Sequence, residues 1–165
     1  DSALEAFDKL GRDVVIKPLF GSQGFGITRI SDLEVARRIF NTLNYSRNVL
    51  YTQEFIHHGK RDIRCLIVGG RLVASMNRRA RGWKTNVSQG AKPVSIVPSE
   101  EIREIAIKST EILGCRVAGV DILESPDGYF VNEVNSQPGF RGLQVVSKVD
   151  VAEEIVRYIL SELKR

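Results

Sequence analysis

The chain has 165 residues, which is enough for one domain or for two small lobes with cores of their own. Its composition, 42% hydrophobic and 27% charged, is that of a globular protein, and no run approaches the roughly 18 apolar residues that cross a membrane. The formal net charge is +4, with the basic residues spread out apart from a cluster at 78–84. An acidic or polyanionic ligand accounts for that cluster, so neither nucleic acid nor a membrane is expected as the main partner.

The two cysteines, Cys65 and Cys115, are each set among apolar residues. Thiols in such surroundings are expected to be buried and reduced, which favours a reducing compartment. We therefore predict a cytoplasmic protein.

The first predicted element is a strand over 14–17, which delivers Lys17 to a glycine-rich loop, and a short apolar segment follows at 27–30. The loop contains Gly21, Ser22, Gly24 and Gly26. Glycines let backbone N–H groups approach an anion closely, and a lysine at the end of a strand is a point charge for phosphate. The residue order fits neither a Walker A loop, in which the lysine follows the glycines, nor a Rossmann turn. The pattern therefore predicts a hairpin whose tip covers phosphate groups.

A helix and a strand are predicted to complete a first small lobe with this hairpin. A capping box at 31–34 and apolar residues at helical spacing predict the helix over 32–43. The strand is expected near 49–55.

The next segment is predicted to open a second lobe. His57 and His58 adjoin Gly59 and are interpreted as surface residues of a turn rather than as zinc ligands. Strands are expected over 63–68 and 71–77, joined by a Gly-Gly turn of the kind that tight hairpins favour. The polar segment after residue 81, up to Lys92, is predicted to be a loop.

Two further helices are predicted in the second half of the chain. The first begins at Ser99 and ends at Gly114, with apolar residues on one face. The last begins at Asp150, with Glu153 as its reciprocal cap. Its apolar residues Val151, Ile155, Ile159 and Leu163 are expected to be buried.

Between these helices, two strand-like segments, 118–123 and 129–135, flank a Ser-Pro-Asp-Gly turn. If they pair as a hairpin, Asp121 lies opposite Glu133, give or take one residue, and Asn135 shares a face with Glu133. Two facing carboxylates repel each other unless a cation lies between them. Two carboxylates and an amide suit Mg²⁺ or Mn²⁺, although an ordinary polar outer face is the alternative.

Taken in order, these motifs resemble those of the ATP-grasp ligases, and more narrowly the RimK-type branch, which adds glutamate or a similar amino acid to a carboxyl acceptor. The likeness runs from about Val14 to the last helix. The motifs are Lys17 with the loop from Gly21 to Gly26, Gln53-Glu54-Phe55-Ile56, Asp62-Ile63-Arg64, Asn77-Arg78-Arg79-Ala80, Thr85-Asn86, Gly119-Val120-Asp121 and Glu133-Val134-Asn135-Ser136-Gln137-Pro138-Gly139.

The resemblance implies an α+β protein with the ATP-grasp fold, in which two α+β lobes with antiparallel sheets enclose a nucleotide cleft. The lobes are expected at 1–55, as a partial N-terminal lobe, and at 56–165, as the C-terminal lobe with the metal site. Family members carry a further N-terminal domain and a helix well before the lysine. The chain is therefore expected to be a fragment that lacks them, and its activity by itself is left open.

The activity implied by the resemblance is ATP- and Mg²⁺- or Mn²⁺-dependent amide formation. An acceptor carboxylate attacks the γ-phosphate of ATP, and the amine of an incoming amino acid, expected to be glutamate, displaces phosphate from the acyl phosphate. The acceptors in the branch are a protein C-terminus, a coenzyme tail and an amino-group carrier protein, and a homo-oligomer is left open. The alternatives are a non-catalytic nucleotide-binding module and a basic RNA-associated module.

The resemblance also implies a role for each motif residue. The metal ligands would be Asp121, Glu133 and Asn135. The residues that hold ATP would be Lys17, Gly21, Ser22, Gly24 and Gly26 at the phosphates, Gln53, Glu54 and Phe55 at the adenine, Asp62 at the ribose, and Lys84 and Asn86 near the triphosphate.

Four arginines are assigned to catalysis and substrate binding. Arg64 and Arg79 are the expected catalytic pair, and Arg78 and Arg141 are expected to hold substrate carboxylates. Arg78 and Arg79 are adjacent on a strand, so only one of them can face inward. Gly119 stands where many members of the superfamily carry an arginine, and the missing charge is assigned to Arg79.

Overall fold

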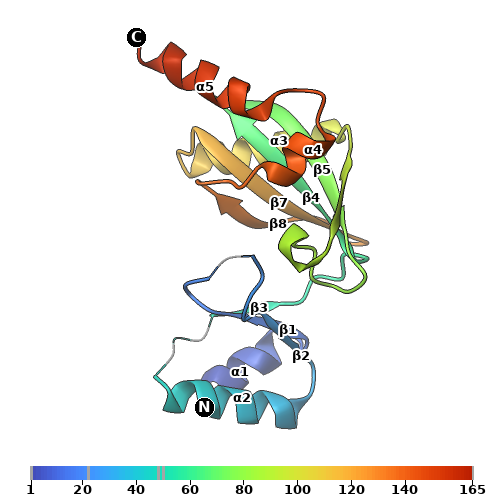
Figure 1. Ribbon diagram of the computed structural model, residues 1–165. Coiled ribbons are helices and arrows are strands. Elements are labelled where there is room, and N and C mark those ends of the chain that lie inside the picture. Colours follow the sequence, from blue (N-terminus) through green and yellow to red (C-terminus); the bar gives the residue numbers. More distant parts are fainter. Residues whose placement is uncertain (1, 22, 48, 50, 165) are drawn as a thin grey trace. The chain divides into compact units, whose positions relative to one another are not determined.

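The computed structural model describes residues 2–21, 23–47, 49 and 51–164. The chain divides into two compact units, residues 1–56 and 57–165, one residue away from the boundary expected between the lobes. Each unit combines helices with one antiparallel sheet, so the α+β fold class is confirmed (Figure 1). Among the described residues, no helix has the length and apolar character needed to span a membrane.

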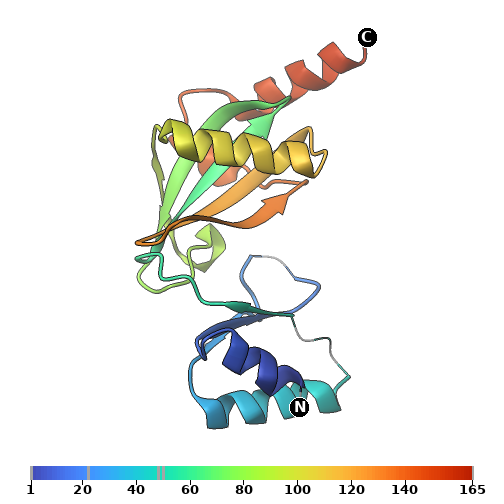
Figure 2. The same ribbon diagram turned by 180° about the vertical axis from the view of Figure 1, so that it is seen from behind.

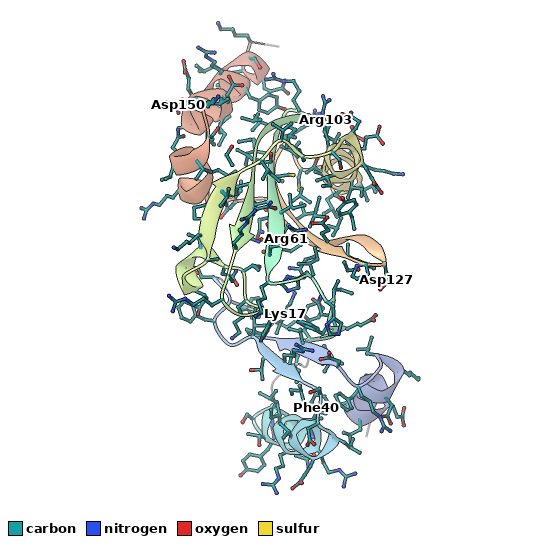
Figure 3. The ribbon with its side chains drawn as sticks, turned by 90° about the vertical axis from the view of Figure 1, so that its right-hand side faces the viewer. Lys17, Phe40, Arg61, Arg103, Asp127 and Asp150 are labelled. Atoms are coloured by element: carbon teal, nitrogen blue, oxygen red, sulfur yellow. The ribbon has the colours of Figure 1, made fainter. Side chains whose placement is uncertain are left out.

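The first unit is built on a three-stranded sheet in the order β2-β1-β3, with β1 at Val14–Lys17, β2 at Thr28–Ile30 and β3 at Tyr51–Glu54. Helices α1, Ser2–Lys9, and α2, Leu33–Tyr45, lie on the same side of this sheet (Figures 1 and 2). The core between them consists of Phe7, Val14, Ile16, Ile30, Ala36 and Phe40, the last of which is labelled in Figure 3.

Two details of the first unit differ from the sequence prediction. Helix α1 was not expected, because the resemblance predicted a chain without the helix that precedes Lys17, yet its Phe7 is fully buried in the core of the unit. The N-cap of α2 is Asp32 alone, whose Oδ1 accepts a hydrogen bond from the Val35 N–H at 2.8 Å. The N-cap therefore lies one residue after the start of the expected capping box, and the helix begins at Leu33.

The second unit is built on a five-stranded sheet in the order β6-β5-β4-β7-β8. Its strands are β4, Arg61–Val68; β5, Arg71–Arg79; β6, Lys92–Ser95; β7, Val117–Ser125; and β8, Gly128–Asn135. The expected β4–β5 hairpin is confirmed, and both turn residues, Gly69 and Gly70, have positive φ angles of 57° and 75°, which a glycine adopts without strain.

The two faces of this sheet are covered by different helices (Figures 1 and 2). Helix α3, Glu100–Ile112, covers the face that we call the α3 face, whose core is Ile63, Cys65, Ile67, Ile102, Ala106, Val120 and Ile122. Helices α4, Arg141–Val146, and α5, Val151–Glu162, cover the opposite face, called the α4 face, whose core is Leu66, Val68, Ala74, Met76, Leu143 and Val151. Because side chains alternate along a strand, even-numbered residues of β4 lie on the α4 face.

The last helix buries less than its apolar pattern suggested. Helix α5 begins after Asp150, as expected (Figure 3), but Ile159 is 48% exposed and Leu163, just past its end, is 78% exposed. The contact instead uses Val151, Ile155 and Tyr158, whose ring lies so close to Gly69 that a Cβ there would be 2.5 Å from it. The expectation for Ile159 and Leu163 was therefore wrong.

The segment from 82 to 92 also has more structure than the loop expected there. It contains a short 3₁₀ helix, Val87–Gln89, and it leads into β6, which pairs with β5. Of the two cysteines, Cys65 is fully buried as predicted, whereas Cys115 is only half-buried.

Candidate functional site

The acidic hairpin of β7 and β8 has the predicted register. Asp121 pairs with Glu133, and Gly119 pairs with Asn135. Immediately after Asp121 the pairing shifts, so that Ile122 lies opposite Val131 and one residue of β8 is left over as a β-bulge. The bulge lies next to the two carboxylates, where such irregularities commonly redirect side chains.

The three oxygen donors come together on one part of the sheet. The Asn135 Nδ2 donates a hydrogen bond to Glu133 Oε1 at 2.9 Å, which confirms that these two residues share a face and leaves the Asn135 Oδ1 directed elsewhere. Glu133 is exposed and Asn135 is half-buried, whereas Asp121 is 1% exposed. In the described part of the chain no three His, Cys, Asp or Glu residues gather as a metal site, so any divalent cation here would use two carboxylates and one amide, a set that suits Mg²⁺.

Two buried arginines hold the carboxylate of Asp121. Arg64 lies directly opposite it on β4, with its Nε against Oδ1 and its Nη2 donating to Oδ2 at 2.9 Å. The Arg78 Nη2 lies 2.8 Å from the same Oδ2. A carboxylate has about four lone-pair positions, so these three contacts leave room for a cation.

The electrostatics of Asp121 reflect its burial. Burial raises the pKa of Asp121 to about 6, while the charges of Arg78 and Arg64 lower it and those of Asp62 and Glu133 raise it. A bound divalent cation would favour the ionised carboxylate, because an opposite charge stabilises it.

Glycine at position 119 makes room for Arg64. A Cβ at Gly119 would lie 2.5 Å from the Arg64 Nη1 and 3.0 Å from the Pro138 Cβ. Arg64 thus occupies the space that a side chain at 119 would take, and its guanidinium reaches Asp121 from the neighbouring strand.

Asp62 lies opposite Arg78 across the β4–β5 pair. The Arg78 Nε donates to Asp62 Oδ1 at 2.7 Å, and the Nη2 donates to Oδ2. The Thr85 hydroxyl donates to the same Oδ2 at 2.6 Å. Burial lowers the pKa of Arg78, but its hydrogen bond to Asp62 and the charge of Asp121 raise it more, so the guanidinium stays charged.

Strand alternation separates Arg78 from Arg79. Arg78 lies on the α4 face, in contact with Asp62 and Asp121. Arg79 is exposed and lies in register with Arg61 on one side and Lys92 on the other, at the edge of the α3 face. The structure therefore brings Arg64 and Arg78 to the carboxylates and places Arg79 away from them.

The remaining predicted residues of the second unit lie outside its strands. Lys84 is half-buried and its Nζ lies 5.4 Å from the centre of the Trp83 ring. The Asn86 carbonyl accepts hydrogen bonds from the N–H groups that close the 3₁₀ turn. Arg141 is exposed in the first turn of α4.

The predicted residues of the first unit are described by themselves. Lys17 ends β1, and in the loop that follows it Gly24 and Gly26 have positive φ angles, which favour glycine there. A Cβ at Gly21 would lie 3.1 Å from Pro18. Ser22 lies outside the described residues.

The predicted adenine-binding segment is the end of β3 and the residue after it. Gln53 and Glu54 pair with Val15 and Val14 of β1. The Phe55 N–H donates to the Asp13 carbonyl at 2.8 Å, and its ring is buried with the Arg29 guanidinium 3.6 Å from its centre. That N–H is thus used within the first unit.

The environments of two residues named in the sequence were not predicted. Thr85 is part of the Thr85-Asn86 motif but was given no role of its own, and its contact with Asp62, 23 residues away, has no local signal. His58 was expected at the surface but is 6% exposed, and its Nδ1 lies 2.8 Å from the Arg61 carbonyl. Since a carbonyl only accepts, this nitrogen carries the proton, and the hydrogen bond explains how a polar ring in a turn becomes buried.

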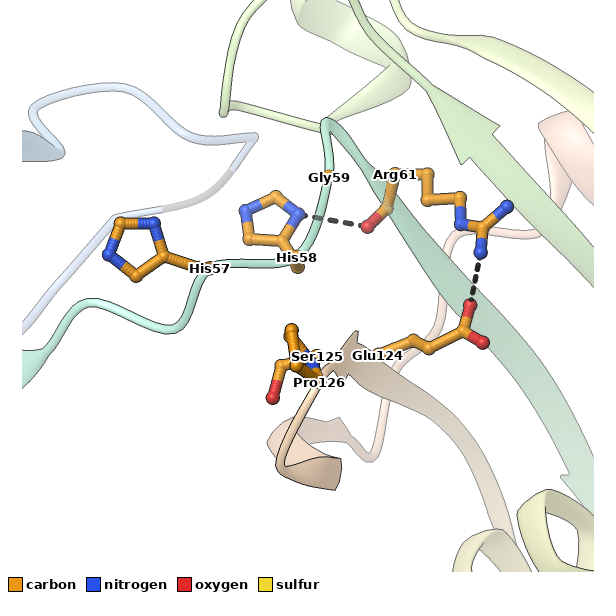
Figure 4. Close-up of a pocket in the computed structure, with 7 residues that line it drawn as sticks. All are labelled: His57, His58, Gly59, Arg61, Glu124, Ser125 and Pro126. Carbon is orange, nitrogen blue, oxygen red and sulfur yellow. Dashed lines mark hydrogen bonds and ion pairs between the residues drawn. The ribbon is translucent and has the colours of Figure 1, made fainter.

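A pocket of about 410 Å³ opens beside His58 at the tip of the acidic hairpin (Figure 4). Across it the Arg61 Nη2 donates to Glu124 Oε2 at 2.8 Å. The residues that line it are His57, His58, Gly59, Arg61, Glu124, Ser125 and Pro126, none of which belongs to the carboxylate cluster.

Comparisons with known proteins identify the family of the chain. The family model of the RimK-like ATP-grasp domain matches residues 2–159. The chain is 38% identical over 169 residues to the tetrahydromethanopterin:alpha-L-glutamate ligase of Methanococcus maripaludis, covering 99% of this chain and 58% of that protein. It is 40% identical over 157 residues to a probable alpha-L-glutamate ligase of Syntrophotalea carbinolica, covering 93% of this chain and 52% of that protein.

A solved structure gives the same fold. The ATP-grasp ligase PsnB, in complex with a phosphomimetic variant of its minimal precursor, Mg and ADP, superposes with a TM-score of 0.75 at 19% identity, over 98% of this chain and 50% of that one. The chain thus spans about half the length of the proteins it matches. With the family model covering nearly all of its residues and the fold in agreement, the chain belongs to the RimK-like ATP-grasp family.

Proposed function

We propose that this chain is the nucleotide- and metal-binding part of an ATP-dependent carboxylate–amine ligase. The observation that carries the proposal is the convergence of Asp121, Glu133 and Asn135 on one face of the β7–β8 hairpin, beside two buried arginines. The relatives named as glutamate ligases support it, since they match the chain over nearly its whole length.

In this proposal the protein supplies charge and position rather than a nucleophile of its own. An acceptor carboxylate attacks the γ-phosphorus of ATP and forms an acyl phosphate. The bond between the γ-phosphorus and the β-phosphate oxygen breaks, and ADP is released. The amine of the amino acid then attacks the acyl carbon, phosphate leaves, and the amine loses a proton as the amide forms. Asp121, Glu133 and Asn135 would hold Mg²⁺, which when bound offsets negative charge on the phosphates; Mn²⁺ suits the same ligands.

The arginine roles follow from their placement. We assign to Arg64 the stabilisation of the negative charge on the transferred phosphoryl group. Arg64 forms an ion pair with Asp121 and occupies the space beside Gly119. Arg78, rather than Arg79, is the second arginine of the site. Arg141 remains a candidate for a substrate carboxylate because it is exposed at the start of α4.

The nucleotide contacts of the first unit remain proposals. Lys17 and the loop glycines Gly21, Gly24 and Gly26 would approach the phosphates, and Gln53 and Glu54 would lie near the adenine.

Lys84 and Asn86 of the second unit would lie near the triphosphate.

The incoming amino acid is proposed to be glutamate, because both relatives described above are named as glutamate ligases. The acceptor would be a carboxylate on a coenzyme tail, a protein C-terminus or a carrier protein.

Calorimetric titration with a non-hydrolysable ATP analogue, with and without Mg²⁺, tests the proposal. We expect binding that is tightened by Mg²⁺, and we expect Glu133→Ala to weaken the Mg²⁺-dependent binding by at least about 10-fold. The control is Glu124→Ala, which removes a carboxylate from the same hairpin on the other face. Equal binding by wild type and Glu133→Ala, or binding that ignores Mg²⁺, would contradict the proposal.

A further inference from the structure

We propose that the edge of the α3 face carries a second anion site, which binds the phosphate group of a small molecule and is separate from the site of the carboxylate cluster. The site combines a row of three cations, Arg61, Arg79 and Lys92, called the cationic row, with the pocket that opens beside His58. All of these residues belong to the second unit. The proposal goes beyond the proposed function and does not depend on it.

The cationic row crosses three neighbouring strands. Arg61 pairs with Arg79 across β4 and β5, and Arg79 pairs with Lys92 across β5 and β6. Residues that lie directly opposite each other project from the same face of a sheet, with their Cβ atoms about 4.5–5.5 Å apart. All three residues are exposed. The row is therefore a line of three positive charges that a dissolved ligand can reach.

The cationic row has more positive charge than its surroundings compensate. The Arg61 Nη2 donates to Glu124 Oε2 at 2.8 Å. In the part of the chain that the structure describes, no carboxylate lies within ion-pair distance of Arg79 or Lys92. Like charges directly opposite each other destabilise a sheet. A bound anion would remove this repulsion between Arg79 and its two neighbours.

The charge and the donors of the row match a phosphate group. A phosphate monoester carries a charge of about −1.5 to −2 at pH 7 and three strong acceptor oxygens, and the row has two uncompensated positive charges. A guanidinium donates two parallel hydrogen bonds to phosphate, and an ammonium group binds it as a point charge. A single carboxylate would balance only one of the two charges. The row therefore favours phosphate.

The pocket provides room for the rest of such a ligand. Its volume of about 410 Å³ lies within the range of roughly 300–1,000 Å³ that is usual for small-molecule sites. Arg61 belongs both to the row and to the pocket lining (Figure 4). Glu124 and Ser125 line the pocket as well, and a carboxylate and a hydroxyl group suit a ligand that carries hydroxyl groups.

The wall of the pocket is held by two hydrogen bonds across the turn that precedes β4. The His58 Nδ1 lies 2.8 Å from the Arg61 carbonyl, and the Arg61 N–H donates to the His58 carbonyl at 3.2 Å. His58 is also 6% exposed. The turn thus positions Arg61 before any ligand arrives, which lowers the entropy cost of binding.

The cationic row lies on the other face of the sheet from the carboxylate cluster. Asp62 and Arg78 contact each other on the α4 face, where Arg78 also reaches Asp121. They directly follow Arg61 and precede Arg79 in the sequence, and successive side chains of a strand point to opposite faces. A phosphate group on the row would therefore bind without displacing a nucleotide from the α4 face.

The test is calorimetry on the full chain with inorganic phosphate and with glycerol 3-phosphate. Ionic strength is kept constant, and a non-hydrolysable ATP analogue with Mg²⁺ is present in excess to fill the nucleotide site. We expect the double variant Arg79→Gln, Lys92→Gln to bind both probes at least about 10-fold more weakly than wild type, because it loses both uncompensated charges. Tighter binding of the ester would assign the site to phosphomonoesters, and equal binding would assign it to free phosphate.

A matched control removes the same charge elsewhere in the second unit. Arg103→Gln with Lys108→Gln replaces two exposed cations of α3 and should keep the wild-type affinity. Melting followed by circular dichroism gives an independent measurement, since phosphate should raise the Tm of wild type and of the control but not that of the double variant. If the double variant is unfolded, Lys92→Gln alone should weaken binding by a smaller factor.

Three results would overturn the proposal. One is a wild-type chain that binds neither probe, and another is unchanged affinity in the folded row variants. The third is an equal loss in the double variant and the control, because this is the effect of net charge alone. A chain that binds phosphate at the row but does not bind the ATP analogue would support this site and contradict the proposed function.

Discussion

At the scale of single residues, the site depends on how closely the backbone of β7 approaches the arginine of the neighbouring strand. Gly119 has no side chain, and the Arg64 guanidinium lies in the space beside it. The size of the residue at 119 therefore decides whether Arg64 can form its ion pair with Asp121. Any residue larger than glycine would push the Arg64 guanidinium away from that carboxylate.

We predict that Gly119→Ala lowers the free energy of unfolding by about 1–3 kcal/mol, because its Cβ would overlap the Arg64 Nη1 and the Pro138 ring. Urea denaturation followed by circular dichroism measures the change. Gly139→Ala is the control, since a Cβ there would meet no atom within 4 Å. Equal stability of the two variants would mean that Arg64 moves aside without cost.

The two cysteines should differ in reactivity. Burial raises the pKa of the Cys65 thiol to about 12, and the charge of Asp121 raises it while that of Arg64 lowers it. We expect a thiol reagent at pH 8 to label only Cys115 in the folded chain and both cysteines in denaturant. Rapid labelling of Cys65 without denaturant would argue against its burial.

The same thiol makes stability depend on pH. Unfolded Cys65 ionises near its ordinary pKa of 9.0, whereas the folded thiol keeps its proton up to about pH 12. Above pH 9 the unfolded state therefore binds fewer protons, and this contribution to stability falls as pH rises. Cys65→Ser would remove this pH dependence, and urea melts between pH 8 and 10 would show the difference in slope.

At the scale of elements, the last helix, α5, has apolar residues on more than one side, and only one of these sides is buried. Val151 is fully buried with Leu143 and Leu66, whereas Leu163 lies in solvent. Tyr158 packs in the same cluster as Val151, on the same side of α5, and its ring lies beside Gly69.

We therefore predict that Val151→Ala lowers the free energy of unfolding by roughly 1–3 kcal/mol, whereas Leu163→Ala changes it by less than about 0.5 kcal/mol. Parallel urea titrations of the two variants test this difference. A larger loss of unfolding free energy for Leu163→Ala than for Val151→Ala would show that Leu163 is buried, as the apolar spacing suggested.

These elements also show what the sequence could and could not predict. That Asp121 lies within one residue of Glu133 follows from the position of the turn, but the exact pairing depends on the bulge after Asp121, which no local pattern announces. That only one of Arg78 and Arg79 faces inward follows from the period of two along a strand, but which one depends on the pairing of Arg78 with Asp62, a contact that no local pattern encodes.

Elements with weak local signals were predicted poorly. Strand β6 contains Pro93 and is largely exposed, so it shows no apolar alternation, and helix α4 has six residues, too few for a helical period to stand out. In α5 the apolar residues occupy more than one row, so spacing alone could not choose the buried one. His58 is buried through a hydrogen bond to a carbonyl, which residue type does not reveal.

At the scale of the whole molecule, each unit has a core made only of its own residues. The first unit's core joins α1 and α2 to its three strands, and the second unit has separate cores on the two faces of its sheet. A domain with its own core can in principle fold alone.

We expect residues 57–165, expressed without the first unit, to unfold cooperatively and to protect Cys65 from a thiol reagent. Circular dichroism melting and labelling at pH 8 would measure this. Loss of the cooperative transition, with Cys65 labelled at the rate of Cys115, would show that the second unit needs the first in order to fold.

The bulge beside Asp121 has a consequence for how the hairpin can vary. Ser125 pairs with Gly128, and counting inward from that pair places Asn132, not Glu133, opposite Asp121. Glu133 would then face Val120, whose side chain lies in the α3-face core. The surplus residue of the bulge shifts the strand pairing by one residue between the turn and the pair of Asp121 and Glu133. Removing that one residue would therefore turn Glu133 toward the α3-face core and away from Asp121.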